Sequence, residues 1–411
     1  MKENPRNWAV VGGGFLGMTL ALRLREKGDQ VTLFEAAPHL GGLADAWKVN
    51  GYTWDRHYHV TLLSDLHLRK LLEQLDLDEA MQWVETRTGF YTDGELYSMS
   101  NTVEFLKFPP LNLIDKLRLG GTIFYASKIK NWKALEKVPV TKWLRRWSGP
   151  NTFEKIWLPL LRAKLGENYK NASAAFIWAI IARMNAARRS GLKKEMFGYL
   201  EGGYDRLNES LTSHLKEKGV EIQTGLPLQT VRKKDHGFDL TFANGDTRNS
   251  FDRVAMTLPS PAAVSICENL STEERKKHEE ICYQGIVCAS VLLKKKLPGY
   301  YVTNITDSWI PFTAVIEMTA LVDPKNFDGH SLVYLPKYVT PDDPIFDRTD
   351  KDIEEEFVGA LLKMYPDLTA EDVLAFKLSR VRNVLALSTL DYSSKLPPME
   401  TSVEGLHIIN S

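Results

Sequence analysis

The sequence predicts an α/β fold made of three parts: a discontinuous domain built on a parallel sheet, a helical insert and a strand-rich domain. Three observations favour this fold class. A strand, a glycine-rich turn, a helix and a second strand follow one another between residues 8 and 35. Residues 109–194 have a helical pattern without an obvious strand, and residues 283–338 have the apolar runs typical of strands.

The first element is an apolar run at 8–11, which predicts a strand that leads into the turn G-G-G-F-L-G at 12–17. Gly12 permits a tight turn, Gly14 lets the backbone approach a pyrophosphate, and Gly17 lets the following helix pack closely on the strand. Gly28 is a plausible C-cap of that helix. Because helix N-termini bind phosphate, the segment predicts a Rossmann-like dinucleotide site.

An acidic residue, Glu35, ends the second predicted strand, about 20 residues after the glycine turn. A carboxylate at this place can accept a hydrogen bond from a ribose hydroxyl. It would also repel a 2′-phosphate, which disfavours NADP. The residues themselves therefore leave both NAD and FAD open.

A second glycine pair, Gly41-Gly42, lies in the segment P-H-L-G-G-L-A at 38–44. This pair resembles the flavin-binding extension of the FAD-dependent amine oxidase superfamily, which includes protoporphyrinogen oxidases, phytoene desaturases and UDP-galactopyranose mutases. The alternative is an ordinary loop turn. The resemblance favours FAD over NAD. It implies cofactor contacts by Gly12, Gly14, Phe15, Leu16, Gly17, Glu35, Ala36, Gly41, Gly42, Leu43 and Ala44.

The middle of the chain predicts a change from mixed structure to helices. Leucines on one side of residues 64–75 predict a helix, and Asp93-Gly94 predicts a tight turn between two short strands. Pro109-Pro110 marks the entry to the helical insert, and Gly149-Pro150 interrupts it.

After residue 195 the pattern becomes mixed again. It predicts a helix that ends at Gly219, a hairpin at Asn244-Gly245, a helix over 353–364 and a final buried strand over 405–411. These elements place a Rossmann-like FAD-binding domain at 1–108, 195–260 and 372–411. The helical insert then covers 109–194, and a strand-rich substrate domain covers 261–371.

A second resemblance lies in E-G-G-Y-D-R-L at 201–207 and the helix and strand that follow it. The pattern is similar to the second flavin-binding stretch of protoporphyrinogen oxidase-like proteins, although a plain glycine turn is the alternative. It implies that Leu228 contacts adenine through its backbone and that Thr257 ends a strand beside the cofactor. The strand at 405–411 lines up with one that usually ends in Gly-Asp. Here Ser411 replaces the acid, so we expect reduced FAD affinity, with the Ser411 hydroxyl as the remaining donor.

The composition limits the classes of partner. The 411 residues carry a net charge of zero, which gives no support to nucleic-acid binding. The three cysteines form no CxxC pair, and no zinc spacing is present, which predicts no metal site and a cytoplasmic protein with reduced thiols. Apolar runs are far shorter than the ~20 residues that span a bilayer, but peripheral membrane contact stays open.

Two histidines, His57 and His59, lie in D-R-H-Y-H at 55–59, near the flavin in the family that the chain resembles. On a strand they would share one face, and a histidine can act as a general base near neutral pH. The alternative is a structural hydrogen bond for each.

The helical insert is rich in cations, which predicts either an anion-binding surface or a solvated helix face. The members are Arg145, Arg146, Arg162, Lys164, Arg183, Arg188 and Arg189. We favour an FAD-dependent oxidoreductase that transfers a hydride or electrons between the flavin and a bulky, largely apolar or anionic small molecule. A redox-neutral isomerase or mutase and a non-catalytic dinucleotide-binding protein are the alternatives. The oligomeric state is left open.

Overall fold

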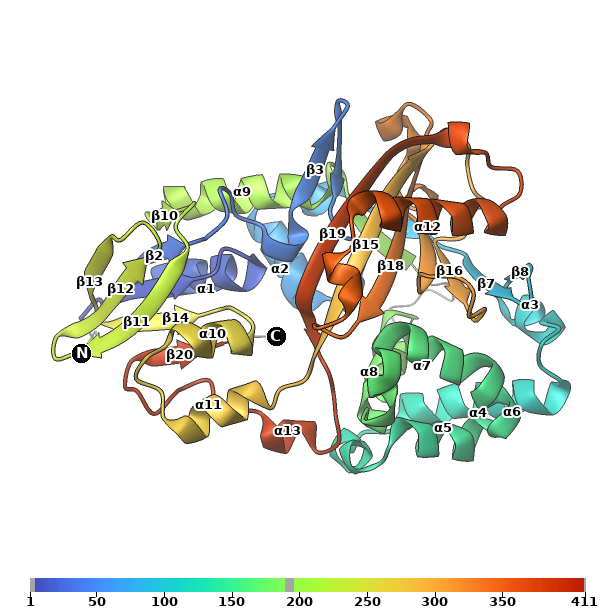
Figure 1. The fold of residues 1–411 in the computed structure, drawn as a ribbon, viewed down its shortest axis with the longest axis horizontal. Coiled ribbons are helices and arrows are strands. Elements are labelled where there is room, and N and C mark those ends of the chain that lie inside the picture. The colour runs from blue at the N-terminus through green and yellow to red at the C-terminus, as the bar shows by residue number, and fades with distance from the viewer. Residues whose placement is uncertain (1–3, 189–195, 410–411) are drawn as a thin grey trace.

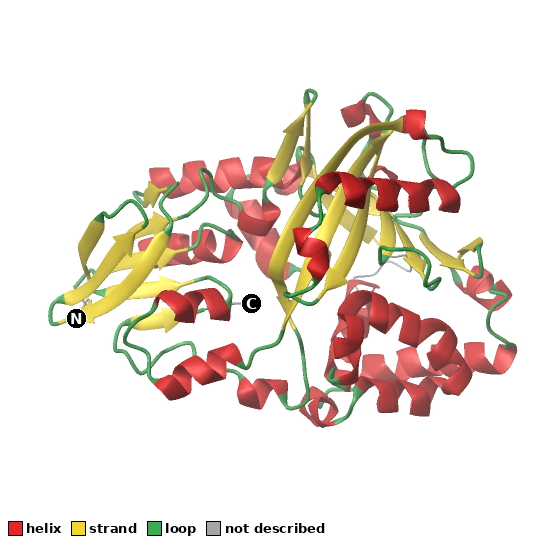
Figure 2. Ribbon diagram, in the orientation of Figure 1, coloured by secondary structure: helices red, strands yellow, loops and turns green. Residues whose placement is uncertain are grey.

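The computed structural model of the protein describes residues 4–188 and 196–409. Its three parts are a parallel sheet with its helices, a larger sheet crossed by one long helix, and a bundle of helices (Figure 1). Figure 2 shows strands in the first two parts and helices throughout the third. The predicted α/β fold class is confirmed.

Five parallel strands form the sheet that carries the N-terminal motif, in the order β10-β2-β1-β14-β20. Their bounds are β1 (Asn7–Val11), β2 (Gln30–Phe34), β10 (Glu221–Gln223), β14 (Arg253–Met256) and β20 (Leu406–Ile408). Because all five strands run in one direction, their carboxyl ends meet at one edge. Ligands of open α/β sheets bind at this edge.

Different layers cover the two faces of the parallel sheet. Helices α1 (Phe15–Glu26), α2 (Leu66–Gln74) and α9 (Gly203–Glu217) pack on the face that includes Val10 and Leu33. A meander of β11 (Leu228–Lys234), β12 (Gly237–Phe242) and β13 (Thr247–Phe251) packs on the opposite face, together with α10 (Ser260–Ile266). The predicted turn at Asn244-Gly245 joins β12 to β13. Helix α11 (Thr272–Glu279) follows α10.

The larger sheet has seven strands in the order β19-β15-β18-β17-β16-β7-β8. Their bounds are β7 (Thr88–Thr92), β8 (Glu95–Ser98), β15 (Tyr283–Leu293), β16 (Val302–Ile305), β17 (Ala314–Glu317), β18 (Ser331–Val339) and β19 (Val373–Ala386). Helix α12 (Asp350–Met364) covers one face with Ile353, Phe357 and Leu361 (Figure 1). The other face points towards the parallel-sheet domain and carries a second apolar core.

The boundaries predicted at 108 and 372 differ from this arrangement. Strand β19 pairs along β15, and β7 pairs with β16, so both belong to the seven-stranded sheet. Of the strands after residue 372, only β20 returns to the parallel sheet, while α13 (Tyr392–Lys395) lies in the connection. The pattern of apolar residues identifies a strand, but it does not identify the strand's partner.

The helical insert packs around its own core, which includes Leu119, Trp143, Leu144 and Leu161. Its helices are α4 (Leu113–Lys128), α5 (Val140–Ser148), α6 (Pro150–Thr152), α7 (Leu158–Leu165) and α8 (Ala174–Arg188). Helix α3 (Thr102–Lys107) precedes the proline pair, and Gly149 separates α5 from α6 as predicted. The described residues of the insert, 109–188, contain isolated bridges but no strand.

Short strands connect the domains. A hairpin of β3 (Ala46–Val49) and β4 (Tyr52–Asp55) follows the second glycine pair. Strands β5 (Thr61–Leu62), β6 (Met81–Glu85) and β9 (Met196–Leu200) form a small separate sheet. The segment between β4 and β5 therefore lies at the junction of the domains, and it contains the two candidate histidines.

Candidate functional site

Three glycines shape the turn at the carboxyl end of β1. A Cβ atom on Gly17 would lie 1.8 Å from the carbonyl oxygen of Gly12, so no side chain fits there. Gly12 has a φ of +110°, and the hydroxyl of Thr257 fills the space beside it. Gly14 is different, because a Cβ atom there would meet nothing within 4 Å. The turn is therefore tightly packed on one side and open at Gly14.

The first turn of α1, next to Gly14, has backbone N–H groups that no side chain caps. Gly14 is the N-cap residue, no side chain caps the helix, and the first turn contains no acidic residue. Uncapped N–H groups and the positive end of the helix dipole are suited to bind phosphate. Leu16, on the same turn, is 39% exposed, while Phe15 is partly buried against Tyr204.

The second glycine pair packs directly on the first motif. The N–H of Gly41 donates to the carbonyl of Gly13 at 2.9 Å, and Gly41 forms a bridge with Gly14. A Cβ atom on Gly42 would lie 3.1 Å from the Cα atom of Gly14, so the two chain segments touch through glycine backbone. We call this arrangement the glycine cradle: Gly12, Gly14, Gly17, Gly41 and Gly42.

Glu35 lies at the edge of the glycine cradle, where β2 ends. One oxygen of its carboxylate accepts a hydrogen bond from the N–H of Gly13 at 2.6 Å, and the other accepts from Ala37 at 2.8 Å. A carboxylate held in this way can also accept from a ribose hydroxyl. The structure therefore brings Glu35 and the two glycine motifs together, as the sequence predicts.

The other residues that the sequence predicts to contact the cofactor differ in how exposed they are. Ala36 and Leu43 are exposed, whereas Ala44 is buried and Leu228, at the start of β11, is partly buried. The hydroxyl of Thr257 lies 2.9 Å and 3.1 Å from the carbonyl oxygens of Val11 and Gly12, so it holds the turn. Ser411 lies outside the described residues.

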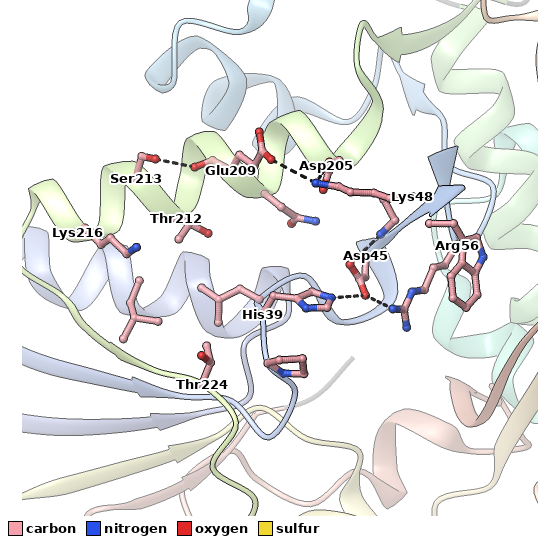
Figure 3. A pocket seen from close by; sticks show the side chains of 16 residues that line it. His39, Asp45, Lys48, Arg56, Asp205, Glu209, Thr212, Ser213, Lys216 and Thr224 are labelled. Atoms are coloured by element: carbon pink, nitrogen blue, oxygen red, sulfur yellow. Dashed lines mark hydrogen bonds and ion pairs between the residues drawn. The ribbon is translucent and has the colours of Figure 1, made fainter. Parts of the chain in front are cut away.

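A cleft of about 990 Å³ is lined by residues that flank Gly41 and Gly42 in the chain, among them His39, Leu40 and Asp45 (Figure 3). Asp45 pairs there with Arg56 at 2.7 Å and with His39 at 2.9 Å, and Lys48 pairs with Asp205 at 3.2 Å. In addition, Asn208 donates to the carbonyl of Ala44 at 2.8 Å. The cleft contains none of the cradle glycines. These contacts instead fix the loop that follows Gly41 and Gly42, a role that the sequence pattern did not reveal.

The two candidate histidines do not share a face. Residues 56–60 form no strand, and their side chains meet different elements. His57 is buried, with Nε2 at 3.2 Å from the hydroxyl of Ser379 on β19. His59 packs edge-on against Tyr204 at the start of α9, and its Nδ1 has no hydrogen-bond partner within the described chain. Burial lowers the pKa of each imidazole to about 4, so both are neutral at pH 7 and are weak bases.

A buried acid, Asp55, stands beside these histidines. Its carboxylate accepts from the N–H of Tyr204 at 2.9 Å, and its backbone carbonyl accepts from the hydroxyl of Tyr334 at 2.6 Å. Burial raises its pKa to about 7. Sequence reasoning did not single out Asp55, although a charged residue that ends an apolar strand is a signal that could have found it.

The pH dependence of stability should report on Asp55. Its pKa is raised from 3.8 to about 7 on folding, so its ionisation disfavours the folded state, and stability falls as pH rises from about 4 to about 7. His57 and His59 act in the opposite direction, because their pKa values fall from 6.5 to about 4 and stability rises over that range. In the Asp55→Asn variant, which keeps an acceptor for Tyr204, we expect a gain relative to the wild type that grows with pH. The gain should be on the order of a few kcal/mol at pH 8.

Urea denaturation of both proteins at pH 5 and pH 8 measures this difference. An equal effect of the substitution at both pH values would show that Asp55 does not titrate between them.

The part of the chain that the structure describes offers no group of three or more His, Cys, Asp or Glu side chains that could hold a metal ion. Nor does any helix in those residues have the length and apolar character to cross a membrane. The open backbone at Gly14, the uncapped helix and Glu35 instead fit the diphosphate and ribose of a dinucleotide.

Known proteins share this architecture. Residues 17–402 match the family model for flavin containing amine oxidoreductase. The 15-cis-phytoene desaturase of Narcissus pseudonarcissus is 21% identical over 430 residues, which cover 97% of this chain and 74% of that protein. The coproporphyrinogen III oxidase of Mycobacterium bovis is 24% identical over 315 residues, which cover 72% of this chain and 67% of that protein.

The crystal structure of reduced UDP-galactopyranose mutase covers 95% of this chain and 86% of its own, with a TM-score of 0.73 and 15% identity, which shows a shared fold. The match of the family model over most of the chain is the stronger finding, and it confirms the predicted choice of FAD over NAD. The chain therefore belongs to the flavin-containing amine oxidoreductase family.

Proposed function

We propose that this protein is an FAD-dependent oxidoreductase that transfers a hydride or electrons between the flavin and a bulky, largely apolar substrate. The observation that supports this most is the glycine cradle, in which two distant glycine motifs touch and leave Gly14 open beside an uncapped helix. The absence of a side chain at Gly42 permits this contact, and the open side at Gly14 is the one that a diphosphate requires.

The residues that would hold FAD are inferred partly from this geometry and partly from the resemblance of the sequence motifs. The diphosphate would lie against Gly14 and the N–H groups of the first turn of α1, and Glu35 would accept from the ribose. The backbone of Leu228 is proposed to contact adenine. Other proposed contacts come from Phe15, Leu16, Ala36, Leu43, Ala44, Thr257 and Ser411. Bound flavin supplies the hydride or electron transfer.

The proposed substrate side is the apolar core between the seven-stranded sheet and the segment after β4. It includes the aromatic side chains of Trp54, Tyr301 and Tyr334, and the hydroxyls of Tyr58 and Tyr338 lie 2.9 Å apart at its border. Such a surface excludes water and suits an apolar substrate. His57 is hydrogen-bonded to Ser379 and is proposed to have a structural role. Nδ1 of His59 makes no hydrogen bond within the described residues and lies 3.9 Å from the Asp55 carboxylate, so His59 is the histidine proposed to exchange a proton, although its lowered pKa makes it a weak base.

The relatives suggest which substrates to test. One is a phytoene desaturase and another a coproporphyrinogen III oxidase, and both names denote bulky molecules, the second with carboxylates. The cations of the insert do not all stand free, because Arg145 pairs with Glu154 and Arg183 with Asp65. Arg189 lies outside the described residues. We therefore propose to test an apolar substrate first and an anionic substrate second.

The purified protein is expected to show the visible absorption bands of oxidised flavin and to release FAD on denaturation. Anaerobic mixing with phytoene or coproporphyrinogen III should bleach these bands for the correct substrate class, because the substrate reduces the flavin. A protein that stays colourless when FAD is added would contradict the proposal. Turnover that needs a reductant but consumes none would instead select the mutase alternative.

A further inference from the structure

The outer face of helices α3 and α4 is unusually apolar. It is formed by six exposed side chains that we call the α3–α4 face: Val103, Leu106, Leu113, Ile114, Leu117 and Phe124. On α4, Leu113, Leu117 and Phe124 are spaced at four and seven residues, so they lie along one side of the helix. Leu117 and Phe124 are each 66% exposed, which is far more than a packed helix face shows.

The inner side of α4 is well anchored, so this exposure does not come from a loose helix. Leu119 and Ala126 are buried in the core of the insert, and Asn112 caps the helix by accepting from the N–H of Asp115. The ammonium group of Lys116 donates to the carbonyl of Leu106 at 2.7 Å and ties α4 to α3. The two helices are therefore joined to each other, and they lie at one end of the molecule (Figure 1).

Three exposed cations lie on the same two helices as this face. Lys107, Arg118 and Lys128 are exposed on the same two helices. The two acids between residues 101 and 133 are Glu104, which accepts from Ser98 and Ser100, and Asp115, which is buried and accepts from Asn151. The two helices therefore combine exposed apolar side chains with an excess of positive charge, since Glu104 is the one acid on them that is not buried.

This combination identifies the occupant. A second copy of the chain meeting this face symmetrically would bring Lys107, Arg118 and Lys128 against the same cations, which is unfavourable. An anionic lipid surface instead neutralises the cations and accepts the leucines and the phenylalanine at the boundary of the acyl chains. The absence of a spanning helix in the described residues fits attachment to one leaflet.

We propose that the α3–α4 face docks this protein on an anionic lipid bilayer, with α4 lying in the plane of the membrane interface. The docking does not depend on the proposed flavin chemistry. The membrane would hold a largely apolar substrate next to the helical insert.

Sedimentation of the full chain with vesicles tests this proposal. We expect binding to vesicles of phosphatidylcholine with phosphatidylglycerol, weaker binding to pure phosphatidylcholine, and loss of binding as salt rises. The variant Leu117→Asp/Phe124→Asp should bind the anionic vesicles more than about tenfold more weakly, because two apolar anchors are removed. The control Leu66→Asp/Met399→Asp changes side chains that are 58% and 65% exposed outside both helices, and it should bind as the wild type does.

Circular dichroism verifies that each variant is folded without reference to flavin, so a failure of the flavin proposal does not imitate a failure of docking. Equal binding by both variants, or no sedimentation of the wild type with anionic vesicles, would overturn the proposal. So would a dimer in solution that Leu117→Asp/Phe124→Asp dissociates, since a second copy would then cover the face.

Discussion

Replacing Gly14 with valine is expected to give a folded protein that has lost its flavin. The added side chain enters open space, since a Cβ atom at Gly14 has no neighbour within 4 Å. It would occupy the place proposed for the diphosphate and keep the phosphates away from the first turn of α1. Losing two charge-assisted hydrogen bonds at about 1.5–3 kcal/mol each weakens FAD binding on the order of 100-fold or more.

The measurement is the flavin content of the purified variant, together with the Kd of added FAD and the Tm of the apoprotein. The same change at Gly359 is the control, because this glycine of α12 also has no neighbour within 4 Å of its Cβ position and lies outside the cradle. Gly359→Val should keep the flavin. Full flavin content in Gly14→Val would show that the cradle is not the diphosphate site.

Replacing Gly17 with valine is expected to prevent stable folding. Its Cβ atom would lie 1.8 Å from the carbonyl oxygen of Gly12 and 3.0 Å from the hydroxyl of Thr257. The carbonyl belongs to the backbone, so it cannot move without separating α1 from β1. Such overpacking is expected to destabilise the protein by more than about 3 kcal/mol, and the parallel sheet should fail to assemble.

Urea denaturation of the apoprotein measures this effect, and it separates the two glycine variants. Gly14→Val should unfold at the same urea concentration as the wild-type apoprotein, whereas Gly17→Val should unfold at a much lower concentration or be recovered as an aggregate. An unchanged midpoint for Gly17→Val would mean that α1 can shift on the sheet, contrary to the contact with Gly12.

The sequence predicts the turn of Gly12, Gly14 and Gly17 well because each of these glycines meets a short-range requirement. The tight turn and the close helix packing each require a glycine at a fixed position in the sequence. The position of Glu35 is also fixed, because one helix and one strand separate it from the turn. The turn at Asn244-Gly245 is predictable for the same reason. That Gly41 pairs with Gly14 needs the resemblance to a family, because no local rule brings the two segments together.

Long-range arrangement explains what the sequence does not predict. Strand β19 has the pattern of any half-buried strand, and only its pairing with β15 reveals its sheet. His57 and His59 turn to different sides because Ser379 and Tyr204 come from distant segments. The ion pairs of Asp45 also join residues with no pattern between them.

The order of strands in the parallel sheet has a consequence for the biosynthesis of the protein. The turn after β1 is held by Thr257, 245 residues after Gly12, and β14 is bordered by β20 near the end of the described chain. A ribosome that adds about 5–20 residues per second emits β1 and β2 long before β14, the other neighbour of β1, and before β20, which borders β14. The side of β1 that pairs with β14 therefore stays exposed until β14 has been synthesised. We expect folding to be slow and to require protection of the nascent chain until β14 and β20 have emerged.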